Sequence, residues 1–203
     1  MPDNRPGLRS TRLPNGVVLT VHRGMSDEQA AALYLLFKHE KLLPFYFHEG
    51  VPSLTDFLRM TVDTRNVFYG CFVGHEKSES VDLVGLVGGT AYTRVGSGGK
   101  LDVGMCFSRS AQSLNSEMAL EFSELAIDDA FQAEDLKLLA MYGTTPSRNL
   151  AAIRFLRRLK FTECGRLPNY CTWEGQPDDA VISALTEQQW YQRKPMTNEE
   201  AIA

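Results

Sequence analysis

The sequence lacks most of the short motifs that assign a chemistry on their own. None of the four cysteines forms a C-x-x-C pair, which excludes a zinc ribbon and a thioredoxin motif. The four histidines are scattered without an H-x-x-x-H spacing, so we expect no metal site. No Walker loop and no G-x-G-x-x-G follows a predicted strand, which argues against a P-loop or Rossmann nucleotide site.

Long apolar runs and an excess of positive charge are also missing. No uninterrupted apolar stretch approaches the ~18 residues of a membrane helix, and the polar N-terminus lacks the core of a secretory signal. The net charge of −4 gives no reason to expect a nucleic-acid or membrane partner. Because Cys71 and Cys106 lie inside apolar runs, we expect reduced, buried thiols and a cytoplasmic protein.

What is present suits one globular domain. The chain has 203 residues, of which 43% are hydrophobic and 23% charged. We predict a flexible arm over residues 1–12, a single domain over 13–190 and a polar tail over 191–203. Periodicity predicts a strand, two helices capped by Ser26 and Ser53, three strands, a helix, a strand, a helix and two strands. This order predicts an α/β (α+β) fold, with a mixed, mostly antiparallel sheet of about seven strands and helices on both faces.

Segments along most of the chain resemble a known family. They are LVGLVGGTAY (83–92), KLDVGMCFS (100–108), SEMALEFSELAIDDAF (116–131), NLAAIRFLRRLKFTECGRL (149–167) and DDAVISALTEQQW (178–190). In order and spacing they resemble the GNAT family of acetyl-CoA-dependent N-acetyltransferases, most closely the branch that acetylates the N-termini of ribosomal proteins. The resemblance implies the GNAT fold, in which the family's fourth and fifth strands, here 100–108 and 136–143, splay apart.

The resemblance also implies acetyl-CoA as co-substrate, no metal, and a cofactor site in the gap between those strands. The pantetheine arm would bond to the backbone of Met105, Cys106 and Phe107. The next loop would wrap the pyrophosphate with backbone N–H groups beside a helix N-terminus, and it consists of Gln112, Ser113, Leu114, Asn115 and Ser116. Asn115 stands where the family has its central glycine, and Glu117 stands where a small residue is usual.

The helix predicted after this strand pair carries two further cofactor candidates. Asn149 suits a helix cap, and in the resembling family it faces the pantetheine arm. Arg154 belongs to an arginine-rich side of the helix, which is either a solvated face or a contact to the 3′-phosphate of CoA. Leu156 occupies the position of the family's acid tyrosine and cannot donate a proton.

Catalytic residues must therefore come from elsewhere. Acetylation of an amine needs a deprotonated amine, a polarised thioester carbonyl and a protonated leaving thiolate. Tyr142, near the end of its strand, is our candidate acid, and a packing tyrosine is the alternative. Asp102 is our candidate base, and surface strand pairing is the alternative. Cys106 suggests a covalent acyl intermediate, but a buried thiol is the preferred interpretation.

The acceptor is less well defined by the sequence. The aromatic stretch LLPFYFHEG (42–50) contains Phe47, His48 and Glu49, which either contact the acceptor or belong to a surface loop. A protein N-terminus, a lysine and a small-molecule amine all remain open, as does the choice between monomer and homodimer. We expect direct acetyl transfer to a primary amine. The alternatives are a catalytically degenerate GNAT-fold protein that acts as a CoA-binding or protein-interaction module, and an unrelated α/β protein.

Overall fold

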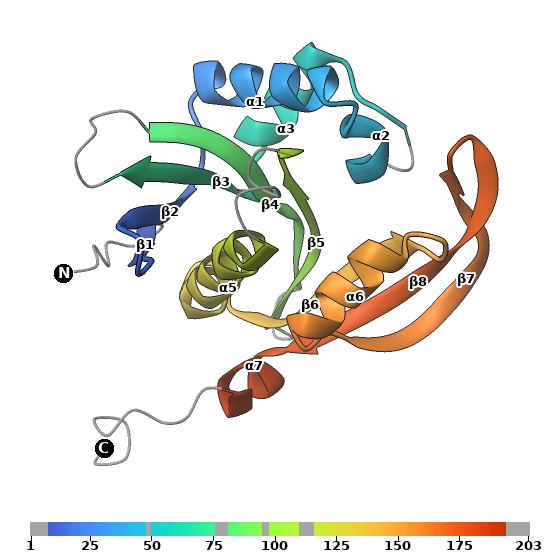
Figure 1. Cartoon of the computed structure of the whole chain (residues 1–203). Helices are drawn as coiled ribbons and strands as arrows, with labels where there is room; N and C mark the ends of the chain where they lie inside the picture. Colours follow the sequence, from blue (N-terminus) through green and yellow to red (C-terminus); the bar gives the residue numbers. More distant parts are fainter. Residues whose placement is uncertain (1–7, 48–49, 76–80, 95–97, 110–115, 194–203) are drawn as a thin grey trace.

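The computed structural model describes residues 8–47, 50–75, 81–94, 98–109 and 116–193. They form one eight-stranded sheet in the order β1-β2-β3-β4-β5-β6-β8-β7 (Figure 1). Neighbouring strands run antiparallel except for β5 and β6, which are parallel. The strands are β1 (Leu8–Arg12), β2 (Val17–Arg23), β3 (Asn66–His75), β4 (Val81–Arg94), β5 (Gly98–Phe107), β6 (Leu138–Pro146), β7 (Thr162–Trp173) and β8 (Gln176–Thr186).

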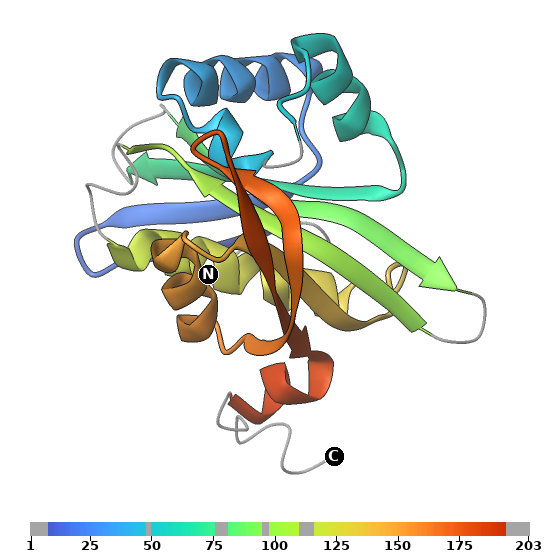
Figure 2. The ribbon, with the colours of Figure 1, turned by 90° about the vertical axis from the view of Figure 1, so that its right-hand side faces the viewer.

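Helices cover both faces of this sheet (Figures 1 and 2). One face carries α1 (Asp27–His39), α2 (Leu43–Tyr46) and α3 (Leu54–Val62), the other carries α5 (Ser116–Gln132) and α6 (Leu150–Arg158), and α7 (Glu187–Arg193) follows the last strand. Each layer buries its own core, with Phe37 and Phe57 in the first and Phe122 and Ile127 in the second. The predicted mixed sheet with two helical layers is confirmed. Among the helices described, none is long and apolar enough to cross a bilayer.

The first helices begin where their capping residues predict. The Ser26 hydroxyl accepts a hydrogen bond from the Gln29 N–H, and the Gln29 side chain accepts one from the Ser26 N–H. The Ser53 hydroxyl accepts from the Asp56 N–H at the start of α3. These bonds satisfy backbone donors that have no partner within the helix, so the sequence fixes both helix starts locally.

The sheet has one strand more than predicted, because β1 lies inside the segment expected to be a flexible arm, residues 1–12. Its residues pair with β2 from Leu8↔His22 to Arg12↔Val18. Arg9 ties the strand to α5 through a 3.0 Å ion pair with the buried carboxylate of Asp129. The arm prediction is therefore wrong for Leu8–Arg12, and residues 1–7 lie outside the described chain. The partner that orders this polar strand is far away in sequence, so local composition did not reveal it.

Candidate active site

The ladder between β5 and β6 stops halfway along both strands. Register pairs run from Gly99↔Leu138 to Asp102↔Tyr142, and no later pair joins these strands within the residues described. Beyond that point β5 stays paired with β4, and β6 stays paired with β8 as far as Pro146. Among the described residues, each strand is therefore paired on its outer side only, and a gap opens between residues 103–107 and 143–146. The splay that the family resemblance predicts is present.

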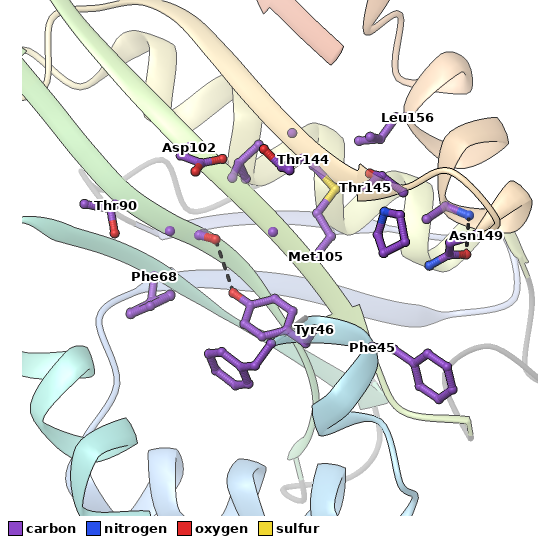
Figure 3. Close-up of a pocket in the computed structure, with 18 of the residues that line it drawn as sticks. Phe45, Tyr46, Phe68, Thr90, Asp102, Met105, Thr144, Thr145, Asn149 and Leu156 are labelled. Carbon is purple, nitrogen blue, oxygen red and sulfur yellow. Dashed lines mark hydrogen bonds between the residues drawn. The ribbon is translucent and has the colours of Figure 1, made fainter. Parts of the chain in front are cut away.

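A cavity of about 390 Å³ is centred on this gap (Figure 3). Its walls come from β4, β5 and β6, from α2 and the segment after it, and from the start of α6. Met105, Phe155 and Leu156 give it an apolar side. Of the described residues that line it, only Asp102 and Tyr46 have side chains that ionise. Any further acid or base would have to reach this cavity from outside its described lining.

Tyr46 lies against the sheet beside Gly104 of β5. Its phenol donates a hydrogen bond to the carbonyl oxygen of Gly88, at 3.2 Å. A Cβ atom on Gly104 would stand only 2.9 Å from the Tyr46 ring, so the ring occupies the space that a side chain would fill. Burial first, and then the nearby Cys106 and Asp102, raise the pKa of the Tyr46 phenol above its ordinary value. Tyr46 is therefore a protonated donor at neutral pH.

Gly88 is a position that only glycine suits. Its φ angle is +149°, a backbone conformation that residues with a side chain rarely adopt. A Cβ atom there would stand 2.0 Å from the carbonyl oxygen of Val67 on β3. The carbonyl that receives the Tyr46 hydrogen bond is thus fixed by the close approach of β3 and β4.

The position of Asn149 fits both interpretations of the sequence, a helix cap and a residue beside the cofactor gap. Its Oδ1 accepts a hydrogen bond from the Ala152 N–H, at 3.1 Å, so it caps α6 (Figure 3). It also lines the cavity. Because the oxygen is committed to the cap, the side-chain amide reaches a ligand only through its NH₂ group, which is a hydrogen-bond donor.

Asp178 of β8 holds the loop that precedes α6. It accepts hydrogen bonds from the Ser147 hydroxyl at 2.9 Å and from the Arg148 N–H at 3.0 Å. Burial alone would raise the pKa of this carboxyl group, but the Arg148 N–H, the Ser147 hydroxyl and the Arg148 guanidinium, 3.3 Å away, together outweigh it. They hold the pKa of Asp178 below its ordinary value. The charged carboxylate therefore fixes the backbone that delivers Asn149 to the cavity wall.

The three predicted pantetheine contacts border the gap with their backbone, but their side chains differ in position. Met105 lines the cavity. Cys106 is buried in the core under α1 and α3, and Phe107 is buried on the opposite face, with its ring 6.1 Å from that of Phe122. Burial raises the pKa of the Cys106 thiol to about 12, which keeps it protonated and unsuited to acyl transfer.

The other predicted site residues are spread more widely. Phe47 lines the first cavity with Asp102, whereas Tyr142 lines a neighbouring cavity that shares Asp102 and Thr144 with the first. Arg154 is exposed on α6, Ser116 is the first residue of α5, and Glu117 is exposed in its first turn. The remaining candidates lie outside the described residues: Gln112, Ser113, Leu114, Asn115, His48 and Glu49.

Sequence reasoning missed the helical turn α2 and its place beside the cavity. The stretch 42–50 is predicted as a loop, but Leu43–Tyr46 forms a helical turn that places Tyr46 in the cavity. The same turn presents Phe45, whose ring lies 5.2 Å from that of Trp173 on β7. The cluster of aromatic residues was the available signal, but it did not indicate which ring meets which strand.

Comparison with known proteins gives a clear structural result. The chain matches no protein-family model, and a search of curated proteins finds no significant match. A probable acetyltransferase of the GNAT family from Chromobacterium violaceum has a similar structure, with a TM-score of 0.64 at 17% identity over 90% of this chain and 91% of that chain. The chain has the GNAT fold.

Other GNAT-fold structures resemble the chain to the same extent. Spermidine N-acetyltransferase from Vibrio cholerae, in complex with CoA and spermine, gives a TM-score of 0.67 at 15% identity, covering 85% of this chain and 98% of that one. Ribosomal-protein-S5-alanine acetyltransferase from Vibrio fischeri gives 0.64 at 16% identity, covering 92% and 99%. Structural similarity at such low sequence identity establishes the GNAT fold alone. The reaction therefore has to be argued from the site.

Proposed function

We propose that the protein is an N-acetyltransferase that moves the acetyl group of acetyl-CoA to a primary amine. The observation that carries the proposal is the gap between β5 and β6, which has a carboxylate, Asp102, at its closed end. Acetyltransferases that act on a polyamine and on a ribosomal protein share this fold.

The gap suits the pantetheine arm of acetyl-CoA. Along residues 103–107 the backbone of β5 has no strand on the β6 side in the described chain, so its amide groups can pair with the amides of an extended arm. Met105 and Leu156 supply apolar contacts, and the NH₂ group of Asn149 supplies a donor. The α5 N-terminus at Ser116 and the guanidinium of Arg154 are our candidates for the phosphates.

Side chains of the protein then accept and donate the protons of the reaction. The Asp102 carboxylate takes a proton from the acceptor ammonium, directly or through a water, and frees the nitrogen lone pair. The nitrogen bonds to the acetyl carbon while the carbon–sulfur bond breaks, and the sulfur leaves with the bond's electrons. The nitrogen gives up its second proton to water as the neutral amide forms. Tyr142 is our candidate donor of the proton that the sulfur takes up. It is half-buried and stands opposite Asp102 in the strand register.

A thiol-release assay tests the proposal directly. Full-length protein with acetyl-CoA and a panel of amines, including spermidine and a peptide with a free N-terminus, should release CoA only when an acceptor is present. Calorimetric titration with acetyl-CoA measures binding separately. Absence of binding at millimolar acetyl-CoA contradicts the proposal.

A second function is favoured by one observation. Leu156, at the family's acid position, is buried in the cavity wall and has no proton to give. A protein that binds CoA without turnover fits that replacement, and the fold then acts as a CoA-binding or protein-interaction module. Tight calorimetric binding of acetyl-CoA, combined with no CoA release across the amine panel, distinguishes this function from catalysis.

A further inference from the structure

A second cavity continues from the first along the exposed part of the sheet. It also measures about 390 Å³, and its described lining includes Tyr92, Lys100, Asp102, Tyr142 and Thr144. We propose, on the basis of the N-acetyltransferase function above, that this cavity binds the tail of the acceptor. We further propose that Lys100 selects an amine that carries a carboxylate.

The two cavities adjoin each other at shared lining residues. Asp102 and Thr144 line both. Lys100 pairs with Tyr92 across β4 and β5, and Asp102 pairs with Tyr142 across β5 and β6. Residues 100 and 102 lie on the same face of β5, because side chains alternate along a strand. A molecule with its amine at Asp102 therefore has its tail directed over Lys100.

The second cavity has a negative charge at one end and a positive charge at the other. Asp102 lies at the inner end, next to the gap, and Lys100 lies two residues further out, which is about 7 Å along a strand. Lys100 is exposed and makes no hydrogen bond or ion pair in the described chain, so its ammonium group has not been neutralised by a neighbour. A positive tail would be repelled there, and a carboxylate would gain a charge-assisted hydrogen bond.

The side walls favour the same class of acceptor. Tyr92, of which 57% is exposed, and Tyr142 flank the path with aromatic rings that can cover a short methylene chain. The acceptor is thus a primary amine with a carboxylate about 7 Å from its nitrogen. An acidic side chain next to a peptide N-terminus has this geometry, and so does an ω-amino acid with a short carbon chain.

Matched acceptor pairs test the inference. We would measure kcat/KM of the full-length protein for 5-aminopentanoate against 5-aminopentanamide, and for a Ser-Glu peptide against the same peptide with Ser-Gln. We expect the carboxylate of each pair to be preferred about tenfold at low salt, and less at high ionic strength. Preference within the small pair alone identifies a small-molecule acceptor, and preference within the peptides alone identifies a protein N-terminus.

Variants at Lys100 provide the second measurement. Lys100→Gln should lower kcat/KM for the carboxylate acceptor to the level of its amide, mainly through KM. Lys100→Glu should reverse the preference, so that a cationic amine such as spermidine becomes the better acceptor. Lys38→Gln changes an exposed lysine on α1, away from both cavities, and is the matched control.

The two proposals fail in different ways. Equal rates for carboxylate and amide, unchanged in both Lys100 variants, overturn the carboxylate inference and leave the N-acetyltransferase function standing. A protein that binds acetyl-CoA but acetylates none of these amines overturns the proposed function, and the inference about its acceptor fails with it.

Discussion

Asp102 and Tyr142 are the last register partners of β5 and β6 before the two strands separate. Partners in a ladder project their side chains from the same face of the sheet, so a carboxylate and a phenol flank the closed end of the gap. The gap supplies room for a thioester, and this pair supplies groups able to move protons.

Asp102→Asn should lower kcat/KM by about 10²-fold at neutral pH, because the amide cannot accept the ammonium proton. The loss should shrink as the pH rises toward the pKa of the acceptor amine, since deprotonated amine then arrives from solution. Rates of thiol release between pH 7 and 10 provide the measurement. Asp82→Asn, at an exposed position on β4, is the control. A variant that keeps wild-type rates at pH 7 removes Asp102 as the base.

Tyr142→Phe should reduce kcat at least tenfold if the phenol protonates the leaving sulfur. Tyr46→Phe should mainly affect stability, because it leaves the Gly88 carbonyl without its donor and costs about 1 kcal/mol in the free energy of unfolding. Single-turnover kinetics and urea unfolding of both variants separate the two roles. If only the Tyr46 variant loses turnover, the proton donor is Tyr46.

Gly104→Ala should destabilise the protein by about 1–3 kcal/mol, because the new Cβ atom would stand 2.9 Å from the Tyr46 ring. The cost should be smaller in a Tyr46→Ala background, where the ring is gone. A double-mutant cycle by urea unfolding measures this coupling. Strictly additive effects would show that the ring does not restrict position 104.

Asn149 substitutions should separate its two tasks. Asn149→Ala removes the cap of α6 and should cost about 1 kcal/mol in unfolding free energy. Asn149→Ser restores a capping oxygen but not the NH₂ donor, so it should recover stability and leave KM for acetyl-CoA raised. A serine variant with wild-type KM would restrict Asn149 to its capping role.

Asp178 should make stability depend on pH. Its pKa is lower in the folded chain than its ordinary value of about 3.9, so its contribution is present above that pH. The contribution is lost as the pH falls through the lowered value, because the folded state then also takes up the proton. The difference in thermal stability between wild type and the Asp178→Asn variant should be largest at neutral pH and should shrink as the pH falls below about 4. A difference that grows in acid contradicts this account.

The sequence predicts local features of this molecule better than long-range ones. The caps at Ser26 and Asn149 follow from side chains a few residues from the donors they satisfy, and the order of strands and helices follows from periodicity. The splay of β5 and β6 came from the family resemblance and is confirmed by the register.

Contacts between distant segments could not be predicted in this way. The ring of Phe45 meets that of Trp173, and Arg9 meets Asp129, only because the sheet brings their elements together. Tyr46 escaped notice for the same reason. Its role depends on a carbonyl on β4 and on the missing side chain of Gly104, and neither is visible from the residues beside it.

The order of the strands has a consequence for how the molecule is assembled during synthesis. β8 is the last strand made, yet it lies between β6 and β7, and it is the only strand paired with β6 along residues 143–146 in the described chain. While the chain emerges from the ribosome, one wall of the cavity therefore has no lateral support until residues 176–186 are available. Nascent chains that end before Gln176 should be unable to retain acetyl-CoA, even though they contain Asp102, Tyr142 and Asn149.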